Sequence, residues 1–268
     1  MFDILHETKY YIYSSFWSIM SLFTNIRILT YFILTGLVLI ISFFPEGWLI
    51  YYLITKPELD VIHFLLSPLY LFLTYCGTVL IFGVIHSQVV VRLLLPYWIK
   101  PGKYSHHSSM GRLVAVRITA DGIFKSMLKV FTFLPFIWGV FLFPYGLRLY
   151  GLKCGKNVHI ATRTYIETGG LVEIGNNSFI GYNSVVTGHA NEDRAIVVDP
   201  TIIGKNCLVG TYSIVACGCE LGDGSTLGGM SGMLKGQKIP PNEIWIGIPA
   251  KLLRKQGEKK DEEIQNVD

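Results

Sequence analysis

The chain has 268 residues and a formal net charge of +4; 51% of its residues are hydrophobic and only 16% are charged. Because soluble domains carry about a quarter charged residues, this composition excludes an ordinary soluble protein and favours a membrane partner. The small positive charge lies near apolar segments and forms no basic stripe on a polar domain, so no nucleic-acid partner is expected.

Two apolar runs predict a helical transmembrane hairpin. Residues 28–44 form an uncharged run of about the length that crosses a hydrocarbon core, and residues 61–91 form a second one. A third run, residues 130–147, contains Pro135 and Pro144. Since proline removes a helical donor and bends or ends a helix, we expect a re-entrant or interfacial segment there.

The charges flanking these runs predict an orientation. The connection between the first two runs is acidic, with Glu46, Lys56, Glu58 and Asp60. The stretch after the second run has one acid, Asp121, and the basic residues Arg92, Lys100, Lys103, Arg112, Arg117, Lys125, Lys129 and Arg148. Because Lys and Arg are retained on the cytoplasmic side, we expect an integral membrane protein whose C-terminal half lies on the cytoplasmic face.

A six-residue repeat begins at Cys154. Each unit has an aliphatic first residue, often Gly or Ala second, and a small fifth residue, as in IATRTY, IGNNSF, IGYNSV, VTGHAN, IGKNCL, VGTYSI and LGDGST. This period is typical of a parallel β-helix, in which the first and fifth side chains, Cys207 and Cys219 among them, point inward. An alternating β-sandwich would need apolar residues at period two.

The charge balance and the repeat together predict the domains. Residues 1–150 carry 11 Lys and Arg against 6 Asp and Glu, whereas residues 151–268 carry 12 against 13. We expect a membrane region over 1–150, a β-helical domain over 151–250, and a tail over 251–268 that is first basic and then acidic.

Several segments resemble a known family. The hexads, the TGHA segment and the ending IPPNEIWIGIPAKLLRK (residues 239–255) resemble the left-handed β-helix acyltransferases, the galactoside and maltose O-acetyltransferase group among them. PGKY (101–104) and LRLYGLKCGKNVHI (147–160) resemble the membrane-embedded, acetyltransferase-like C-terminal regions of polylysine synthetase, although SHHSSMGR departs from that pattern. The expected fold is therefore an α-helical transmembrane hairpin followed by a left-handed parallel β-helix, an all-β solenoid.

His189 is the candidate general base. It is the fourth residue of VTGHAN, where we expect a solvent-facing corner, and it precedes an interruption of the repeat over residues 192–202. Acyl transfer needs a base near neutral pH to take the proton of the acceptor, which suits imidazole. The resemblance implies the same role for this histidine, in a groove between two subunits of a trimer; the alternative is a surface histidine at a turn.

The resemblance also implies the surrounding site. Thr211 matches the position whose main-chain amide stabilises the oxyanion or positions the donor. The positions that match coenzyme A-binding residues are Gly229, Lys235, Lys251 and Arg254. Glu192 and Asp193, beside the base, are candidates to orient it or to bind the acceptor. The alternative for these charged residues is a solvated surface.

Three functions remain open from the sequence. The first is a membrane-bound, homotrimeric acyltransferase that uses acetyl-CoA, another acyl-CoA or a carrier thioester, with a hydroxyl or amine acceptor and membrane lipid as a partner. The second is a metal-dependent β-helix enzyme like the carbonic anhydrases; these need three histidine ligands, and the repeat region has only His159 and His189, so no metal is expected. The third is a non-catalytic trimeric scaffold that docks a carrier protein or membrane synthase, because a fold does not fix a function.

Overall fold

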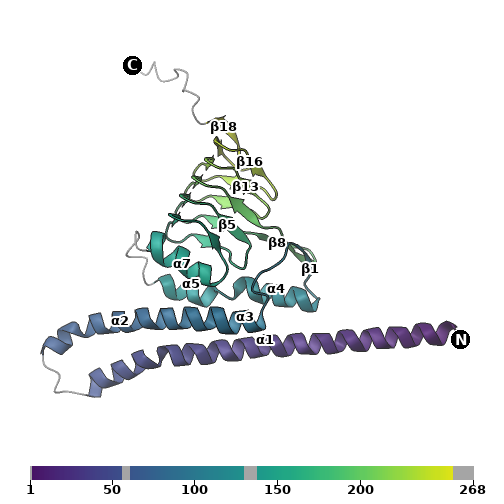
Figure 1. Cartoon of the computed structure of the whole chain (residues 1–268), viewed down its shortest axis with the longest axis horizontal. Coiled ribbons are helices and arrows are strands. Elements are labelled where there is room, and N and C mark those ends of the chain that lie inside the picture. The colour runs from purple at the N-terminus through teal and green to yellow at the C-terminus, as the bar shows by residue number, and fades with distance from the viewer. Residues whose placement is uncertain (1, 56–60, 130–137, 256–268) are drawn as a thin grey trace. The chain divides into compact units, whose positions relative to one another are not determined.

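The computed structural model describes residues 2–55, 61–129 and 138–255 (Figure 1). The chain divides into two compact units. The helical unit comprises Met1–Ile99, Tyr104–Val130 and Asp193–Ile196, and the β-helix unit comprises Lys100–Lys103, Phe131–Glu192 and Val197–Asp268. The domain limits expected from the sequence stay a prediction.

Two long helices dominate the helical unit. Among the described residues, two helical segments are apolar and long enough to cross a membrane. One is Ser18–Thr55 within α1; the other is Leu65–Leu94, which begins in α2 and continues through η1 and α3. The other elements of this unit are short. The helices are α1 (Phe2–Thr55), α2 (Val61–Ile85), the π-helix η1 (His86–Val91), α3 (Arg92–Leu94), α4 (Ser109–Thr119) and α5 (Gly122–Leu128).

Glu46 corrects one expectation from the sequence. It was expected in the polar connection between the spans, but it lies inside α1 with only 8% of its surface exposed. The reason is that the apolar pattern resumes after Pro45 with the segment GWLIYYLIT, so the helix continues to Thr55. Glu46 therefore contributes nothing to the charge of the connection.

Two buried polar contacts lie in the helical unit, one between α1 and η1 and one at the start of α5. Thr35 Oγ1 lies 3.1 Å from His86 Nε2, and His86 is fully buried. Asp121, which precedes α5, pairs with Lys125 at 2.8 Å; the two side chains are 2% and 12% exposed.

Three parallel sheets form the β-helix, and Figure 1 shows its coils stacked from β5 to β18. The first sheet contains β2 (Lys153–Cys154), β5 (Val172–Ile174), β10 (Thr201–Ile203), β13 (Glu220–Leu221) and β16 (Lys238–Ile239). The second contains β3 (His159–Ile160), β6 (Phe179–Ile180), β11 (Leu208–Val209), β14 (Thr226–Leu227), β17 (Glu243–Ile246) and, antiparallel to β17, β18 (Lys251–Lys255). The third contains β4 (Tyr165–Ile166), β7 (Val185–Val186), β12 (Ile214–Val215) and β15 (Gly232–Met233). The predicted β-helix is confirmed.

Each coil turns three corners. Corner 1 leads from the first sheet to the second, corner 2 from the second to the third, and corner 3 from the third sheet back to the next strand of the first. In the first coil along the chain these corners are residues 155–158, 161–164 and 167–171. At corner 1, Asn157 and Asn177 have positive φ, and Nδ2 of Asn157 donates a hydrogen bond to Oδ1 of Asn177 at 3.2 Å. Asparagine tolerates this left-handed conformation, which explains why it recurs in the hexads.

The repeat pattern also explains the core. The aliphatic first residues are buried, with Ile160, Ile180 and Val209 fully inaccessible. The small fifth residue fits because its polar atom reaches the next coil: Ser184 Oγ donates to Gly210 O at 2.8 Å, and Ser213 Oγ donates to Gly228 O at the same distance. Cys207 and Cys219 are buried at equivalent positions, as expected, with 2% and 0% exposed.

Residues 189–200 leave the coils and return, and we call them the excursion loop. The loop contains β8 (His189–Glu192) and β9 (Ala195–Val198), which form a sheet of order β1-β9-β8 with β1 (Gly102–Ser105). Asp199 N donates to Gly188 O at 2.9 Å, and Thr201 then pairs with Val172 in the first sheet. The interruption therefore begins at His189, three residues earlier than the sequence suggested.

The described part of the third apolar run, residues 138–147, falls in the β-helix unit. Residues 130–137 of the run lie outside the described ones, and the remainder forms the π-helix η3 (Trp138–Leu142) and α7 (Phe143–Leu149). Pro144 is the second residue of α7, which continues directly from η3. A re-entrant or interfacial role for this run stays a prediction.

Candidate active site

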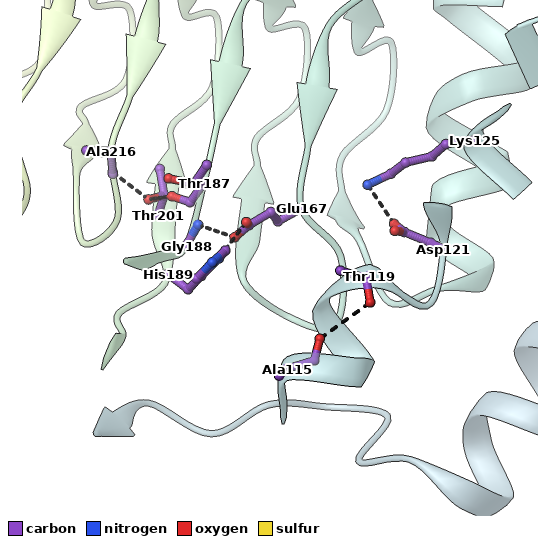
Figure 2. Close-up of polar contacts among 10 residues, drawn as sticks. All are labelled: Ala115, Thr119, Asp121, Lys125, Glu167, Thr187, Gly188, His189, Thr201 and Ala216. Atoms are coloured by element: carbon purple, nitrogen blue, oxygen red, sulfur yellow. Dashed lines mark hydrogen bonds and ion pairs between the residues drawn. The ribbon is translucent and has the colours of Figure 1, made fainter. Parts of the chain in front are cut away.

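His189 and Glu167 form a close pair at corner 3 (Figure 2). His189 begins β8, and Glu167 directly follows β4. Nδ1 of His189 lies 2.6 Å from Oε1 of Glu167, and the two side chains are 16% and 1% exposed. His189 is therefore only partly exposed to solvent, since Nδ1 of its imidazole faces a buried carboxylate.

Glu167 is itself held by the backbone. Its Oε2 accepts a hydrogen bond from Gly188 N at 2.8 Å. Position 188 has no room for a side chain, because a Cβ there would lie 2.0 Å from the carbonyl oxygen of Leu171. With a carboxylate opposite Nδ1, the tautomer that carries its proton on Nδ1 is favoured, which leaves Nε2 of His189 as the basic nitrogen.

The sequence reasoning missed Glu167, although a signal was present. In the unit IETGGL, Glu167 occupies the second position of the hexad, where neighbouring units have Gly155, Ala161 and Gly175. A carboxylate at a position that usually holds a small residue is not explained by the repeat alone.

Glu192 lies in an ion-pair cluster with two lysines. Lys235 Nζ is 2.6 Å from Glu192 Oε1, and Lys103 Nζ is 3.3 Å from Glu192 Oε2. Hydrogen bonds from Lys235 and then Lys103 lower the pKa of Glu192, and the bond to Glu192 raises the pKa of Lys235. Glu167, and not Glu192, therefore contacts His189, and acceptor binding by Glu192 stays a prediction.

Asp193 is highly exposed. Its Oδ2 lies 3.5 Å from Nε of the adjacent Arg194, and the two side chains are 93% and 88% exposed. Since exposed pairs of this kind contribute little to stability, Asp193 remains available for a ligand, and its role with an acceptor stays a prediction.

The remaining predicted residues lie elsewhere on the β-helix. Thr211 and Gly229 are neighbours at corner 2, where a Cβ on Gly229 would lie 3.5 Å from Thr211 O. Lys251 and Arg254 lie on β18 and are exposed. Within a single chain, Lys235 contacts Glu192, and Thr211 lies beside Gly229. Thr211 and Gly229 lie at corner 2, whereas His189 lies at corner 3.

Two buried thiols of the β-helix are packing groups. Burial raises the pKa of Cys219 to about 11 and raises that of Cys207, so both thiols stay protonated and act as packing groups. The described residues contain no group of three or more His, Cys, Asp or Glu side chains able to hold a metal ion. The expectation of no metal stays a prediction.

Comparisons with known proteins agree with the repeat. Residues 200–235 match the bacterial transferase hexapeptide family (six repeats), and residues 171–197 match the hexapeptide repeat of succinyl-transferase. The chain is 29% identical over 202 residues to delta-poly-L-ornithine synthetase of Acinetobacter baumannii (strain AB307-0294); the match covers 74% of this chain but only 15% of the synthetase. A maltose O-acetyltransferase structure from Clostridium difficile 630 has 18% identity and a TM-score of 0.41, covering 59% of this chain and 94% of that one.

Two Escherichia coli (strain K12) proteins named as acetyltransferases are also similar. The chain is 30% identical over 113 residues to galactoside O-acetyltransferase, covering 37% of this chain and 55% of that protein. It is 32% identical over 145 residues to WcaF, a protein named for acetyl transfer in colanic acid biosynthesis, covering 45% of this chain and 76% of WcaF. The chain therefore belongs to the hexapeptide-repeat acyltransferases, as its hexads and TGHA segment predicted.

Proposed function

We propose that the protein is a membrane-bound enzyme that transfers an acyl group, acetyl in the simplest case, from a coenzyme A or carrier thioester to a hydroxyl or amine. The observation that carries this proposal is the buried Glu167 carboxylate 2.6 Å from His189. It leaves a basic Nε2 at a corner of a β-helix whose relatives are named as acetyltransferases.

The reaction follows from that geometry. Nε2 of His189 removes the proton from the acceptor while its oxygen or nitrogen attacks the thioester carbonyl. The C–S bond of the tetrahedral intermediate then breaks, and the imidazolium returns its proton to the leaving thiolate. Glu167 stabilises the imidazolium between these steps, and the amide of Thr211 stabilises the oxyanion.

The location of Thr211 favours a trimer. Since Thr211 and Gly229 lie at corner 2 and His189 at corner 3, the site becomes complete when corner 2 of one chain meets corner 3 of the next. Corner 2 and its surroundings expose apolar side chains suited to such an interface: Tyr212 (51%), Ile214 (50%), Met230 (72%) and Ile248 (71%).

The donor would lie beside the same corners, with Gly229, Lys235, Lys251 and Arg254 as its contacts. No metal takes part in this scheme. Because Glu192 holds Lys235 at 2.6 Å, a donor phosphate must compete with Glu192 for that ammonium group.

Membrane attachment is supported by the long helices. Over residues 18–55, α1 exposes many apolar side chains, including Phe32 (58%), Ile40 (69%) and Phe44 (70%), which suit contact with lipid. The basic stretch after α2 favours the cytoplasmic face for the β-helix. The match to a short part of a synthetase favours, as a second candidate, a scaffold that docks a synthase or carrier protein.

Thiol release by the full-length protein in detergent tests the proposal. A panel of acyl-CoAs is combined with alcohol and amine acceptors, and free thiol is followed over time. We expect His189→Ala to lower kcat about 10² to 10⁴-fold. The matched control is His159→Gln, at the other histidine of the β-helix, which stacks on Phe179 with ring centroids 4.8 Å apart. Equal rates for wild type and His189→Ala would refute the base, and no thiol release from any donor would favour the scaffold.

A further inference from the structure

A pocket of about 500 Å³ opens at corner 1 of the first coils along the chain, in the β-helix unit. Its lining includes Arg148 from α7, the strand residues Lys153, Cys154 and Glu173, and Lys205 from the turn after β10. His189 lies at corner 3, so this pocket is separate from the proposed acyl-transfer site.

The charge of the lining is positive. Three basic side chains, those of Arg148, Lys153 and Lys205, line the pocket with a single carboxylate, that of Glu173. Lys153 Nζ lies 3.3 Å from Glu173 Oε2, and both side chains are about half exposed. Burial raises the pKa of the Cys154 thiol, which therefore adds no negative charge. The pocket thus favours an anion.

Arg148 is fixed in place at the pocket. Its Nη2 donates hydrogen bonds to Cys154 O at 2.7 Å and to Gly155 O at 2.5 Å. Its guanidinium carbon lies 4.4 Å from the centroid of the Tyr145 ring. A guanidinium held by contacts with backbone and ring loses little side-chain entropy on binding, and its planar shape suits the oxygens of a phosphate group.

We propose that this pocket binds a phosphate group, carried either by a phospholipid headgroup or by a small soluble molecule. Arg148 and Lys205 contact the phosphate oxygens, while Glu173 weakens binding because it occupies Lys153. The volume accommodates a phosphate together with the first atoms of the group that it esterifies. This site adds a second ligand to the protein and does not depend on acyl transfer.

Cys154 provides a reporter inside the pocket. The full-length protein is treated with N-ethylmaleimide at mildly alkaline pH, because the raised pKa slows reaction at neutrality, and modification of Cys154 is measured by peptide mass spectrometry. We expect glycerol 3-phosphate, but not glycerol, to slow the modification if the source is soluble. If the source is lipid, nanodiscs that contain phosphatidylglycerol, whose phosphate carries a net negative charge, will protect Cys154 more strongly than nanodiscs of phosphatidylcholine alone, in which choline neutralises the phosphate.

Two variants should change phosphate binding in opposite directions. Lys205→Gln should weaken binding about three- to tenfold, and Glu173→Gln should strengthen it because Lys153 is released. The matched controls are Lys238→Gln and Glu220→Gln, which disrupt a similar pair on the same sheet at 2.7 Å without lining the pocket, and neither should change protection.

Each outcome decides the proposal. Protection by either phosphate source that weakens in Lys205→Gln supports it, as does protection that increases in Glu173→Gln. No protection from either source, or protection equal in wild type and Lys205→Gln, would overturn it. Should Lys205→Gln fail to fold, Glu173→Gln decides alone, since unchanged or weaker protection in that variant contradicts the assigned charges.

Discussion

Oε1 of Glu167 lies 2.6 Å from Nδ1 of His189, although the two residues belong to consecutive coils and are separated by 22 positions in the sequence. The carboxylate is almost completely buried and also accepts the N–H of Gly188, so both of its oxygens are engaged. The histidine is therefore oriented by a rigid part of the β-helix and not by the excursion loop that it begins.

Glu167→Gln should lower kcat about 100-fold while the KM of the thioester donor changes little. The amide can present its N–H to Nδ1, which would favour the wrong tautomer and leave the basic nitrogen facing inward. Steady-state kinetics with one donor and acceptor measure the effect, and Glu220→Gln on the first sheet is the control. A fall in kcat/KM that comes entirely from KM would show that Glu167 serves binding and not orientation of the base.

Glu192→Gln should loosen the excursion loop, because Lys235 and Lys103 lose their ionic partner. Trypsin cleavage after the exposed Arg194 should become several-fold faster, since local opening exposes the backbone to the protease. Gel analysis of timed digests gives the rate. Glu220→Gln should digest like the wild type, and an unchanged rate for Glu192→Gln would mean that the lysines do not anchor the loop.

The ion pairs of Glu192 with Lys235 and Lys103 should stabilise the excursion loop over a definite pH range. The pKa of Glu192 is lowered, so its contribution is present above the ordinary carboxyl range and is lost as pH falls through the lowered value. The pKa of Lys235 is raised, so its contribution is lost only as pH rises through a value above the ordinary lysine range. The ratio of digestion rates between Glu192→Gln and wild type should thus stay constant from pH 7 to 9, and a ratio that falls towards one by pH 9 would contradict the pairing.

Thr201→Val should destabilise the β-helix by about 1 to 3 kcal/mol. Thr201 is fully buried, and its hydroxyl lies 2.6 Å from Thr187 O and 3.0 Å from Ala216 O (Figure 2). Valine keeps the shape but leaves these carbonyls without that donor. Thermal unfolding followed by circular dichroism should show a lower Tm, whereas Thr201→Ser should lose less; equal losses would assign the effect to packing.

Asp121→Asn should destabilise the helical unit by about 3 to 5 kcal/mol, because it leaves the ammonium of Lys125 without its carboxylate at 2.8 Å (Figure 2). The double variant Asp121→Asn with Lys125→Met should recover part of that loss, since the buried ammonium is then removed together with its carboxylate. Thermal unfolding of the detergent-solubilised chain provides the comparison. If the double variant is less stable than Asp121→Asn, the pair is not the source of the loss.

Local patterns predicted the β-helix well because each hexad repeats the same physical demand. An inward aliphatic residue such as Ile180 and a small inward one such as Ser184 satisfy the core in every coil, so the period carries the fold. Glu46 shows the limit of such patterns: its charge suggested a loop, but the apolar residues on both sides keep it within α1. The end of a helix depends on the whole segment and not on one acid.

The site was predicted less completely, since it depends on contacts between coils. His189 and Lys235 were recognised by motif, but the partner of each is fixed by stacking: Glu167 comes from the preceding coil, and Glu192 reaches Lys235 across the loop. Spacing within one hexad contains no information about which side chain of the next coil lies above it.

The coil closes beneath the excursion loop, so changes in the loop can be distinguished from changes in the coils. Asp199 N bonds Gly188 O, and Thr201 resumes the first sheet opposite Val172, so the coil is completed as if residues 189–200 were an insertion. We expect length changes at the exposed residues 191–194 to leave the stacking of neighbouring coils and the Glu167–His189 pair intact. The tip of the loop can therefore change the side chains that it presents without any rebuilding of the β-helix core.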